Sequence, residues 1–517
     1  MLNTFFKNML CCALLIAQVN LLWAQEDPAF NDGNTAYYIP SPNRNTFYDL
    51  VVTDDGGIIM AGVGEPETWN FDFAAIRLRA NGQIDSTFGD NGVSLIDFKE
   101  GNYDDRCYAA ALQSDERIVL AGVSNDNGRM VRLNTDGSID SSFVFQNTGS
   151  PAINDILITG DDKIIAAGVS GFSDIFVSLY NADGRLDETF AQQGSGSYNV
   201  GAGIDEEEVQ IILQDDGKII VTGRVDNRNF AVRVNTGGAI DSSYAANGIA
   251  WVDMVYSSTD GEQAAAALQS DGKLIMAGSR ETGSFYLHKM SAARLNTDGS
   301  IDSTFGQNGY ATVTETPLNA SFKEAEARFV LIDDNDFIYL GGRKAKSTGW
   351  WNFAITRLTP DGQLDSTFAD NGYAYTGGSG SGGVAGSGET ITAMAWDNDK
   401  IVAGGEFYVN RFLTGKTATG MEKPAAQTVR SFQLGANYPN PFNPVTTIPY
   451  TLGSAADVTL RVFDVSGRRV AEYHYKNRAP GNHRIRFNGF NLSSGLYFYR
   501  LIVEGNISAN RRMILLK

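Results

Sequence analysis

Short apolar runs separated by polar turns fill most of the chain, and residues 241–309 show the pattern most plainly. Two of the runs there meet at Ser270-Asp271-Gly272, and another ends at Asn296-Thr297-Asp298-Gly299. Runs this short, rich in Ile, Val, Leu and Ala and bounded by such turns, predict β-strands joined by hairpins. Each unit of this kind is expected to hold four strands, here Ile249–Met254, Ala264–Leu268, Lys273–Ala277 and Ala292–Leu295.

The third run of each unit is mostly apolar without alternation. A strand that is apolar on both faces must be covered on both faces. Small four-stranded sheets stacked face to face around an axis meet this requirement, which predicts an all-β fold with a β-propeller. The third runs are Ile58–Ala61, Ile118–Ala121, Ile164–Ala167, Ile219–Thr222, Leu274–Ala277, Ile338–Gly341 and Ile401–Gly404.

A motif of Asp followed three residues later by Phe or Tyr recurs once per unit. Its seven copies predict seven blades within residues 25–413. The aspartate suits an Asx-turn, and the aromatic ring is expected to pack beneath the connection between neighbouring blades. The copies are Asp27 with Phe30, Asp85 with Phe88, Asp140 with Phe143, Asp187 with Phe190, Asp241 with Tyr244, Asp302 with Phe305, and Asp365 with Phe368.

The two ends of the array complement each other. The first motif precedes the first unit, whereas the last unit, Ile391–Leu413, has no motif behind it. The sequence leaves open whether residues 35–40 pair with the first blade or close the last one.

The repeat resembles a known family in two adjacent segments. Arg294–Gly306 (Arg-Leu-Asn-Thr-Asp-Gly-Ser-Ile-Asp-Ser-Thr-Phe-Gly) and the preceding Ala267–Gly278 are similar to the delta-60 repeat. The resemblance covers nearly all of residues 27–413. It implies an extracytoplasmic repeat protein and names no particular activity.

Residues 1–24 have the layout of a secretory signal peptide, with Lys7 ahead of the apolar run Met9–Leu22 and the small Ala24 before the expected cleavage point. No later stretch has the length of a membrane-spanning helix, so a soluble mature protein is expected. Cys11 and Cys12 lie in the signal, which leaves Cys107 as the only other cysteine. The exported chain is therefore expected to have no internal disulfide.

The carboxy-terminal part has a different pattern. Residues 414–430 show no periodicity and predict a linker. Alternating runs in residues 431–517 predict a small Ig-like antiparallel sandwich. The expected strands are Thr447–Leu452, Val458–Phe463, His483–Phe487, Gly495–Leu501 and Arg512–Leu516.

The same segment resembles the type A C-terminal sorting domain of the type IX secretion system. The resemblance implies export across an outer membrane, recognition of residues 431–517 by the secretion machinery, and cleavage in the linker with anchoring to surface glycolipid. A generic Ig-like domain that itself binds a ligand is the alternative. The matching pieces are Leu434–Pro444, Val462–Arg468, Pro480–His483, Leu492–Leu501 and Met513–Lys517.

Charge separates the two parts. Residues 431–517 hold 11 basic and 4 acidic residues, whereas the rest of the mature chain holds 29 basic and 56 acidic residues. So acidic a body argues against nucleic acid or an anionic membrane surface as a partner.

Binding residues are expected at the end of the ring where loops vary in length, opposite the repeated turns. Exposed tryptophans beside arginines could stack on a sugar or clamp a protein loop. Alternatively, Trp350 and Trp351 plug blade edges. The candidates are Trp69, Trp350, Trp351, Arg224, Arg228 and Arg280.

Two further sets of charged residues recur. Acidic residues just before the second strand could form a cation-binding ring near the axis, or could pair with arginines or backbone amides. Arginines on the fourth strand recur in nearly every unit, which indicates pairing with aspartates and not catalysis. The acidic set is Glu207, Glu262, Glu326 and Glu389, and the arginines are Arg77, Arg132, Arg233, Arg294, Arg357 and Arg411.

Histidines are scarce: His288, His474 and His483 are the three in the chain. A Ser-His-Asp set or a multi-histidine metal site in the propeller needs more than His288 supplies. We therefore favour a secreted or surface-displayed protein that binds a glycan or protein without catalysis, cofactor or metal. The alternative is an extracellular carboxylate-dependent hydrolase or lyase acting on polysaccharide.

Overall fold

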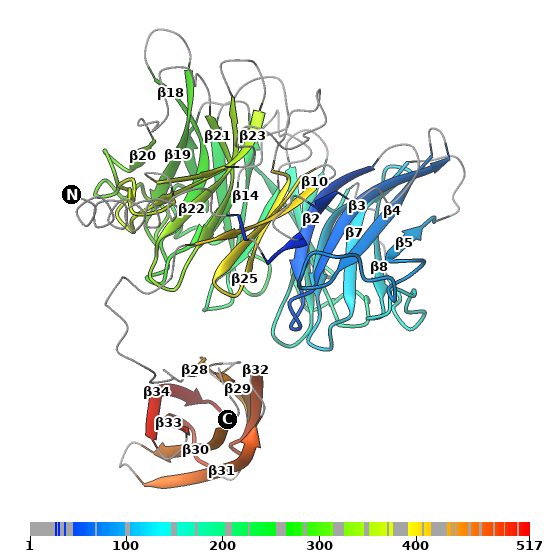
Figure 1. Ribbon diagram of the computed structural model, residues 1–517. Coiled ribbons are helices and arrows are strands. Elements are labelled where there is room, and N and C mark those ends of the chain that lie inside the picture. Colours follow the sequence, from blue (N-terminus) through cyan, green and yellow to red (C-terminus); the bar gives the residue numbers. More distant parts are fainter. Residues whose placement is uncertain are drawn as a thin grey trace, which may run out of the picture. The chain divides into compact units, whose positions relative to one another are not determined.

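The protein is described by a computed structural model in which two compact units, residues Met1–Thr417 and Ala418–Lys517, are treated separately (Figure 1). The described residues are 26–517 without 28, 32–35, 38–44, 68–69, 99–103, 146–151, 171–173, 202–208, 226–227, 255–264, 283–286, 314–324, 346–350, 370–371, 376–390, 406–407, 415–431, 436, 438–439, 441, 453–455, 465–467, 479–480, 491 and 504–505. The predicted signal peptide and nearly all of the predicted linker lie outside this set.

The described part of the first unit forms seven antiparallel sheets, six with four strands and one with three. In hydrogen-bonded order they are sheet 1, β2 (Asn45–Val52), β3 (Ile58–Glu67), β4 (Asn70–Leu78), β5 (Val93–Ile96); sheet 2, β6 (Asp105–Leu112), β7 (Ile118–Ser124), β8 (Asn127–Leu133); sheet 3, β9 (Asp155–Ile158), β10 (Ile164–Ser170), β11 (Asp174–Tyr180), β12 (Ser195–Asn199); sheet 4, β13 (Gln210–Leu213), β14 (Ile219–Val225), β15 (Arg228–Val234), β16 (Ile249–Asp253); sheet 5, β17 (Ala266–Leu268), β18 (Leu274–Thr282), β19 (Leu287–Leu295), β20 (Tyr310–Thr312); sheet 6, β21 (Ala325–Ile332), β22 (Ile338–Ala345), β23 (Trp351–Leu358), β24 (Tyr373–Tyr375); and sheet 7, β25 (Ala393–Asp397), β26 (Lys400–Gly404), β27 (Tyr408–Leu413), β1 (Ala36–Tyr37).

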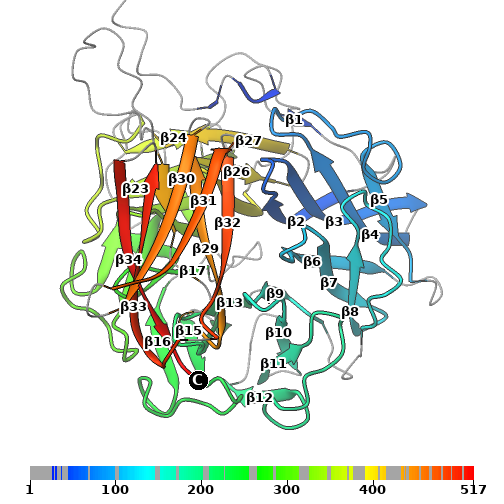
Figure 2. The same cartoon turned by 90° about the horizontal axis from the view of Figure 1, so that it is seen from below.

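The sheets follow one another around a ring, with β2, β6, β9 and β13 towards its middle and β5, β8 and β12 at its periphery (Figure 2). A buried apolar cluster fills each junction between successive sheets. One such cluster joins sheet 7 back to sheet 1 through Val402 and Val409 against Ile58 and Met60. The second strands, such as β10, are buried along nearly their whole length, as the uninterrupted apolar runs predict.

The amino-terminal segment closes the last sheet, which resolves the question left open by the sequence. Ala36 and Tyr37 of β1 pair with Val409 and Tyr408 of β27, and Glu26 forms a bridge with Phe412. In each of the other five four-stranded sheets, the strand that follows an Asp-x-x-Phe motif is the outermost strand, and it belongs to the same sheet as the three strands before the motif. The structural sheet is therefore offset by one strand from the sequence unit.

Sheet 2 has three strands in its described part. Its described part ends with β8 and the motif residues Asp140 and Phe143. The position where a fourth strand is expected falls on residues 146–151, outside the described set. In the described part of the chain, no helix is long and apolar enough to cross a membrane.

The second unit, called the C-terminal module, contains two antiparallel sheets that share one buried core. Tyr450 and Ile485 from one sheet and Leu460 and Tyr499 from the other meet in this core. The first sheet is β28 (Phe432–Leu434), β29 (Val445–Leu452) and β32 (Gly481–Asn488); the second is β31 (Arg469–Arg478), β30 (Ala456–Asp464), β33 (Gly495–Val503) and β34 (Asn506–Leu515).

Candidate functional site

The Asp-x-x-Phe motifs form charged clamps at one end of the ring, here called the turn end. In sheet 5, Asp302 accepts hydrogen bonds from the backbone N–H (3.0 Å) and hydroxyl (2.6 Å) of Thr304 through Oδ1. Its Oδ2 lies 2.9 Å from Nε of Arg294 and 2.9 Å from Nζ of Lys273. The Arg294 guanidinium lies 4.7 Å from the centre of the Phe305 ring. One turn thus joins an Asx-turn, an ion pair and a cation–π contact.

The clamp recurs around the ring. Asp27 forms ion pairs with Arg411 at 2.8 Å and with Lys400 at 2.7 Å, although nearly the whole sequence of the unit separates it from them. Sheet 3 is the exception: Leu179 occupies the arginine position, and Lys163 alone pairs with Asp187, at 2.7 Å. The other arginine–aspartate pairs are Arg77–Asp85, Arg132–Asp140, Arg233–Asp241 and Arg357–Asp365.

Five of the seven aromatic rings of the motif lie against a glycine in the turn of the next sheet, close to the position that the sequence predicts. Gly362 of sheet 6 has a φ of +86°, and a Cβ added there would lie 2.7 Å from the Phe305 ring. The corresponding distances at the other turns are 2.9 Å from Phe30 at Gly82, 3.0 Å from Phe88 at Gly137, 2.8 Å from Phe143 at Gly184 and 2.9 Å from Tyr244 at Gly299. A larger residue than glycine would therefore displace the ring or the turn.

For the other two rings, a glycine contact of this kind is not among the nearest contacts of the described turns. Phe190 is buried in the cluster between sheets 3 and 4, and its neighbour Ala191 lies against Gly238 of the next turn in its place. Phe368 packs edge-on against Tyr339, with ring centres 5.6 Å apart, and the turn of sheet 7 that corresponds to the turn of Gly362 follows β27, where residues 415–431 lie outside the described set. The motif therefore places its ring between sheets more consistently than beneath a turn.

Burial and arginine contact also vary among the rings. Phe143 is only partly buried, whereas the other six rings are at most 2% exposed. An arginine lies within 5.0 Å of the ring centre of Phe30, Phe143, Tyr244, Phe305 and Phe368. Phe190 has no such arginine in its own sheet, because Leu179 stands at that position.

Hydrogen bonds and ion pairs hold the motif carboxylates in their charged form. Lys163 beside Asp187 lowers the pKa of that carboxyl to about 2, and the Ser243 hydroxyl does the same for the pKa of Asp241. Carboxylates held in this way have a structural role.

The opposite end of the ring is here called the loop end. The connection from β14 to β15 and the last residues of the outer strand β16 lie there in sheet 4. Arg228, which begins β15, lies 2.9 Å from Oδ1 of Asp253, the last residue of β16. Its guanidinium also lies 4.8 Å from the centre of the Trp251 ring. Arg228 and Asp253 keep 52% and 79% of their side-chain surface exposed. Sequence analysis predicted Arg228 and missed Trp251 and Asp253, which only strand pairing brings to it.

The other predicted binding residues are placed as follows. Arg280 on β18 lies 4.2 Å from the centre of the Tyr310 ring. Arg224 is partly buried on β14, and Trp351 begins β23 with its side chain outside the described set. Trp69 and Trp350 lie outside the described residues.

One member of the predicted acidic ring is described. Glu326 on β21 is 1% exposed and lies 2.6 Å from Nε of Arg343 on the neighbouring strand β22. This glutamate is thus held by an arginine within its own sheet. Glu207, Glu262 and Glu389 lie outside the described residues.

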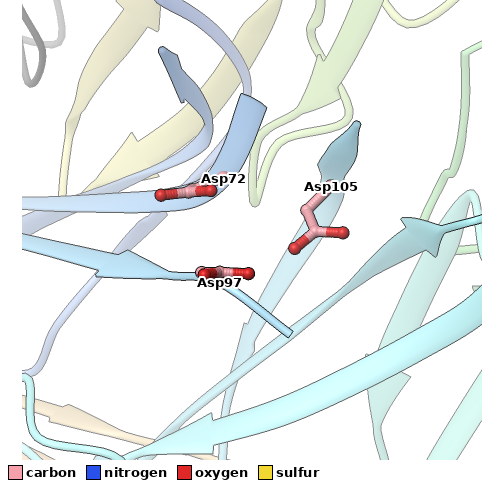
Figure 3. Close-up of side chains that lie close together, drawn as sticks. All are labelled: Asp72, Asp97 and Asp105. Atoms are coloured by element: carbon pink, nitrogen blue, oxygen red, sulfur yellow. The ribbon is translucent and has the colours of Figure 1, made fainter. Parts of the chain in front are cut away.

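Three aspartates at the loop end of sheets 1 and 2 come together instead (Figure 3). Asp72 and Asp105 are buried, Asp97 is exposed, and one carboxylate oxygen from each lies within 4.8 Å of the others. Carboxylate oxygens at this separation could hold a hard cation such as Ca²⁺. No sequence spacing indicates this group, because it depends on packing between two sheets.

Two more carboxyls that sequence analysis missed lie on inner strands. Asp49 on β2 accepts a hydrogen bond from the Ala110 N–H of the next sheet (2.8 Å), and Asp155 on β9 accepts one from the Ile211 N–H (2.6 Å). Burial raises the pKa of Asp49 to about 7 and that of Asp155 to about 8. Each joins neighbouring inner strands.

Comparisons with known proteins agree with this organisation. A family described as a β-propeller domain of unknown function, DUF5122, matches residues 53–88, 113–143, 159–190, 214–244, 269–305 and 339–368. A secretion system C-terminal sorting domain matches residues 436–516. No curated protein matches the chain. The sorting domain indicates export by the type IX secretion system, to the cell surface or the medium.

Several solved structures are similar in fold at low identity. PorZ, a surface component of the type IX secretion system of Porphyromonas gingivalis, is 14% identical with a TM-score of 0.37; the match covers 92% of this chain and 60% of PorZ. A Lactobacillus plantarum protein is 12% identical (TM-score 0.36; 83% and 98% covered). The β-propeller domain of the Trilobed protease from Pyrococcus furiosus is 9% identical (TM-score 0.36; 71% and 94% covered). The chain thus carries six matches to the DUF5122 β-propeller family and, over residues 436–516, a secretion system C-terminal sorting domain.

Proposed function

We propose that the chain is an exported binding protein without catalytic activity. In this proposal the seven sheets are the blades of one closed seven-bladed propeller within residues 25–413, and the loop end binds an extracellular glycan or protein. Residues 414–430 are the linker, and residues 431–517 are an Ig-like module that the type IX secretion machinery recognises. A signal peptide, residues 1–24, starts the export.

The Arg228–Trp251–Asp253 cluster carries the binding proposal. An indole ring offers a face for stacking, and an exposed arginine and aspartate beside it offer donors and acceptors for sugar hydroxyls or a polar protein loop. At the turn end, by contrast, arginines such as Arg294 and Arg357 are buried in clamps. Trp69, Trp350, Trp351, Arg224 and Arg280 are proposed to extend the same surface.

A screen of the full chain against glycan arrays and extracellular proteins tests this proposal. Arg228→Ala and Asp253→Ala should each weaken binding about tenfold, the loss expected for one charge-assisted hydrogen bond. Arg185→Ala is the matched control, because Arg185 also forms an exposed pair, with Asp183, at the turn end. If all three variants lost affinity equally, or if none lost affinity, the loop end would not be the binding surface.

A polysaccharide hydrolase or lyase is the second candidate, favoured by the Asp72–Asp97–Asp105 group. Paired carboxylates a few ångströms apart can serve as acid and nucleophile in glycoside cleavage. Turnover of polysaccharides that is abolished by Asp97→Asn would establish this candidate in place of simple binding.

Export is tested separately. Deletion of residues 431–517 should leave the propeller unit in the periplasm, because the sorting domain is removed. Cell fractionation and surface proteolysis measure this outcome. Surface delivery of the truncated chain would show that another segment directs export.

A further inference from the structure

A cavity of about 730 Å³ lies at the turn end of sheets 4, 5 and 6, away from the proposed loop-end surface. The inner strands β13, β17 and β21 end around it, and the turns after these strands form its rim. Ligand sites in proteins typically have volumes of a few hundred to about a thousand Å³. Its size therefore suits a small molecule or a single protein side chain.

The cavity lies where a bridge between sheets is missing. Gln269 of sheet 5 donates to the carbonyls of Asp336 (3.2 Å) and Pro360 (3.1 Å) of sheet 6, and Gln113 makes the equivalent bonds from sheet 2 to sheet 3. Gln214 occupies the same position in sheet 4 and lines the cavity. Its Oε1 is buried without a hydrogen-bond partner among the described residues. A buried amide oxygen without a donor is a costly feature, and rotation of this side chain into the cavity would bring the oxygen within reach of a ligand donor.

Three apolar side chains form one wall. Leu213, Leu268 and Ile332 each end an inner strand and each pair with the first residue of the next strand. All three are partly buried and line the cavity. Equivalent positions in three successive sheets thus give a continuous aliphatic surface.

The charges that remain available at the rim are negative. Lys218 and Arg233 line the cavity, but both pair with Asp241, at 3.4 and 2.9 Å. Asp215 and Asp334 are exposed, and within the described part of the chain their carboxylates make no ion pair or hydrogen bond. A ligand in the cavity therefore meets two carboxylates that have no partner among the described residues, whereas both cations of the lining, Lys218 and Arg233, are already paired.

We propose that this cavity binds an organic cation with an aliphatic stem. Its ammonium or guanidinium group pairs with Asp215 and Asp334 and donates to Gln214 Oε1, while the stem lies on Leu213, Leu268 and Ile332. Either a lysine or arginine side chain of a peptide or a free polyamine supplies this chemistry. The site is independent of ligand binding at the loop end.

Isothermal titration of the full chain tests the site with two probes, the peptide acetyl-Lys-Leu-Lys-amide and spermidine. Binding of the peptide alone identifies a basic peptide as the ligand, and binding of spermidine alone identifies a polyamine; binding of both shows that the cation suffices. Asp215→Asn/Asp334→Asn should weaken binding by about tenfold or more, since both counter-charges are removed. The proposal is overturned if neither probe binds, or if this variant binds as tightly as wild type.

Two further variants separate the site from nonspecific attraction to an acidic protein. Asp399→Asn removes an exposed carboxylate in the corresponding turn of sheet 7, outside the cavity lining, and should leave affinity unchanged. Gln214→Ala should weaken binding about threefold without lowering the unfolding temperature, because its side chain makes no bond to a described residue. Equal weakening by Asp399→Asn would overturn the proposal.

Discussion

At the scale of single residues, the clamps differ in a way that predicts different costs of mutation. Asp302 faces both Arg294 and Lys273, and Arg294 is 9% exposed in its side chain. Asp302→Ala leaves a buried guanidinium without its counter-charge, so the free energy of unfolding should fall by about 3 kcal/mol. Asp187→Ala in sheet 3 should cost about 1 kcal/mol, because its partner Lys163 can turn to solvent. Urea unfolding of both variants measures the difference, and equal losses would contradict this account of the clamp.

Cys107 offers a simple probe of unfolding. Its side chain is fully buried on β6, and burial raises the pKa of the thiol well above its usual value. Neither access nor thiolate is available in the native state, so a thiol reagent should modify Cys107 in a chain without residues 1–24 only as denaturant unfolds sheet 2. Mass spectrometry across a urea series measures this, and rapid labelling without urea would show that the sheet opens locally.

At the scale of elements, the amino-terminal segment is the part on which ring closure depends. It supplies β1 to sheet 7 and Asp27 to Arg411 and Lys400. A chain that begins at residue 39 should expose the edge of β27 and leave Arg411 without Asp27, so amide exchange should accelerate over Tyr408–Leu413 and the unfolding temperature should drop.

Asp27→Ala is the matched variant for this deletion, because it removes the ion pairs and keeps the strand. Exchange in β27 should rise less in this variant than in the deletion. Unchanged exchange in both would mean that sheet 7 is stable with three strands.

Strands were predictable where the residues of one segment carry the signal. The unbroken apolar runs predicted β7, β10 and β14, and the Asp271-Gly272 turn predicted the hairpin of β17 and β18, because burial on both faces and turn geometry are local properties. β31 of the C-terminal module was missed. Its run carries four charged residues, Arg469, Glu472, Lys476 and Arg478, and it lies at a sheet edge where charged side chains can reach solvent.

Sites formed between sheets were not predictable in the same way. Asp72, Asp97 and Asp105 meet only because sheets 1 and 2 pack together. Gln214 and Gln269 differ in the residue that follows, Asp215 against Ser270, and Ser270 donates to Asp336 of the neighbouring sheet. Whether the amide bridges two sheets or lines a cavity depends on such contacts between sheets. The repeated residues of this chain belong to the scaffold, so residues that differ between repeats could be assigned to sites only from the structure.

At the scale of the whole molecule, two groups of carboxyls respond to pH in opposite directions. The pKa values of Asp187 and Asp241 are lowered to about 2, so their contribution to stability is present above about pH 4 and is lost as the pH falls towards 2. The pKa values of Asp49 and Asp155 are raised to about 7 and about 8, so their contribution is complete below about pH 4 and is lost as the pH rises through 7 to 8. Stability should therefore peak in mildly acidic solution.

The double variant Asp49→Asn/Asp155→Asn isolates the second group. Asparagine keeps an oxygen that can accept the N–H of Ala110 or Ile211 and cannot ionise, so the variant should lack the loss of stability that these two carboxyls cause in wild type between about pH 4 and 8. Repulsion among the many other acidic residues also grows over this range, but it acts on both proteins. The difference between their unfolding temperatures, measured from about pH 3 to 9, should therefore widen as the pH rises and level off near pH 8. A difference that is constant with pH would show that both carboxyls ionise in the folded ring as readily as in the unfolded chain.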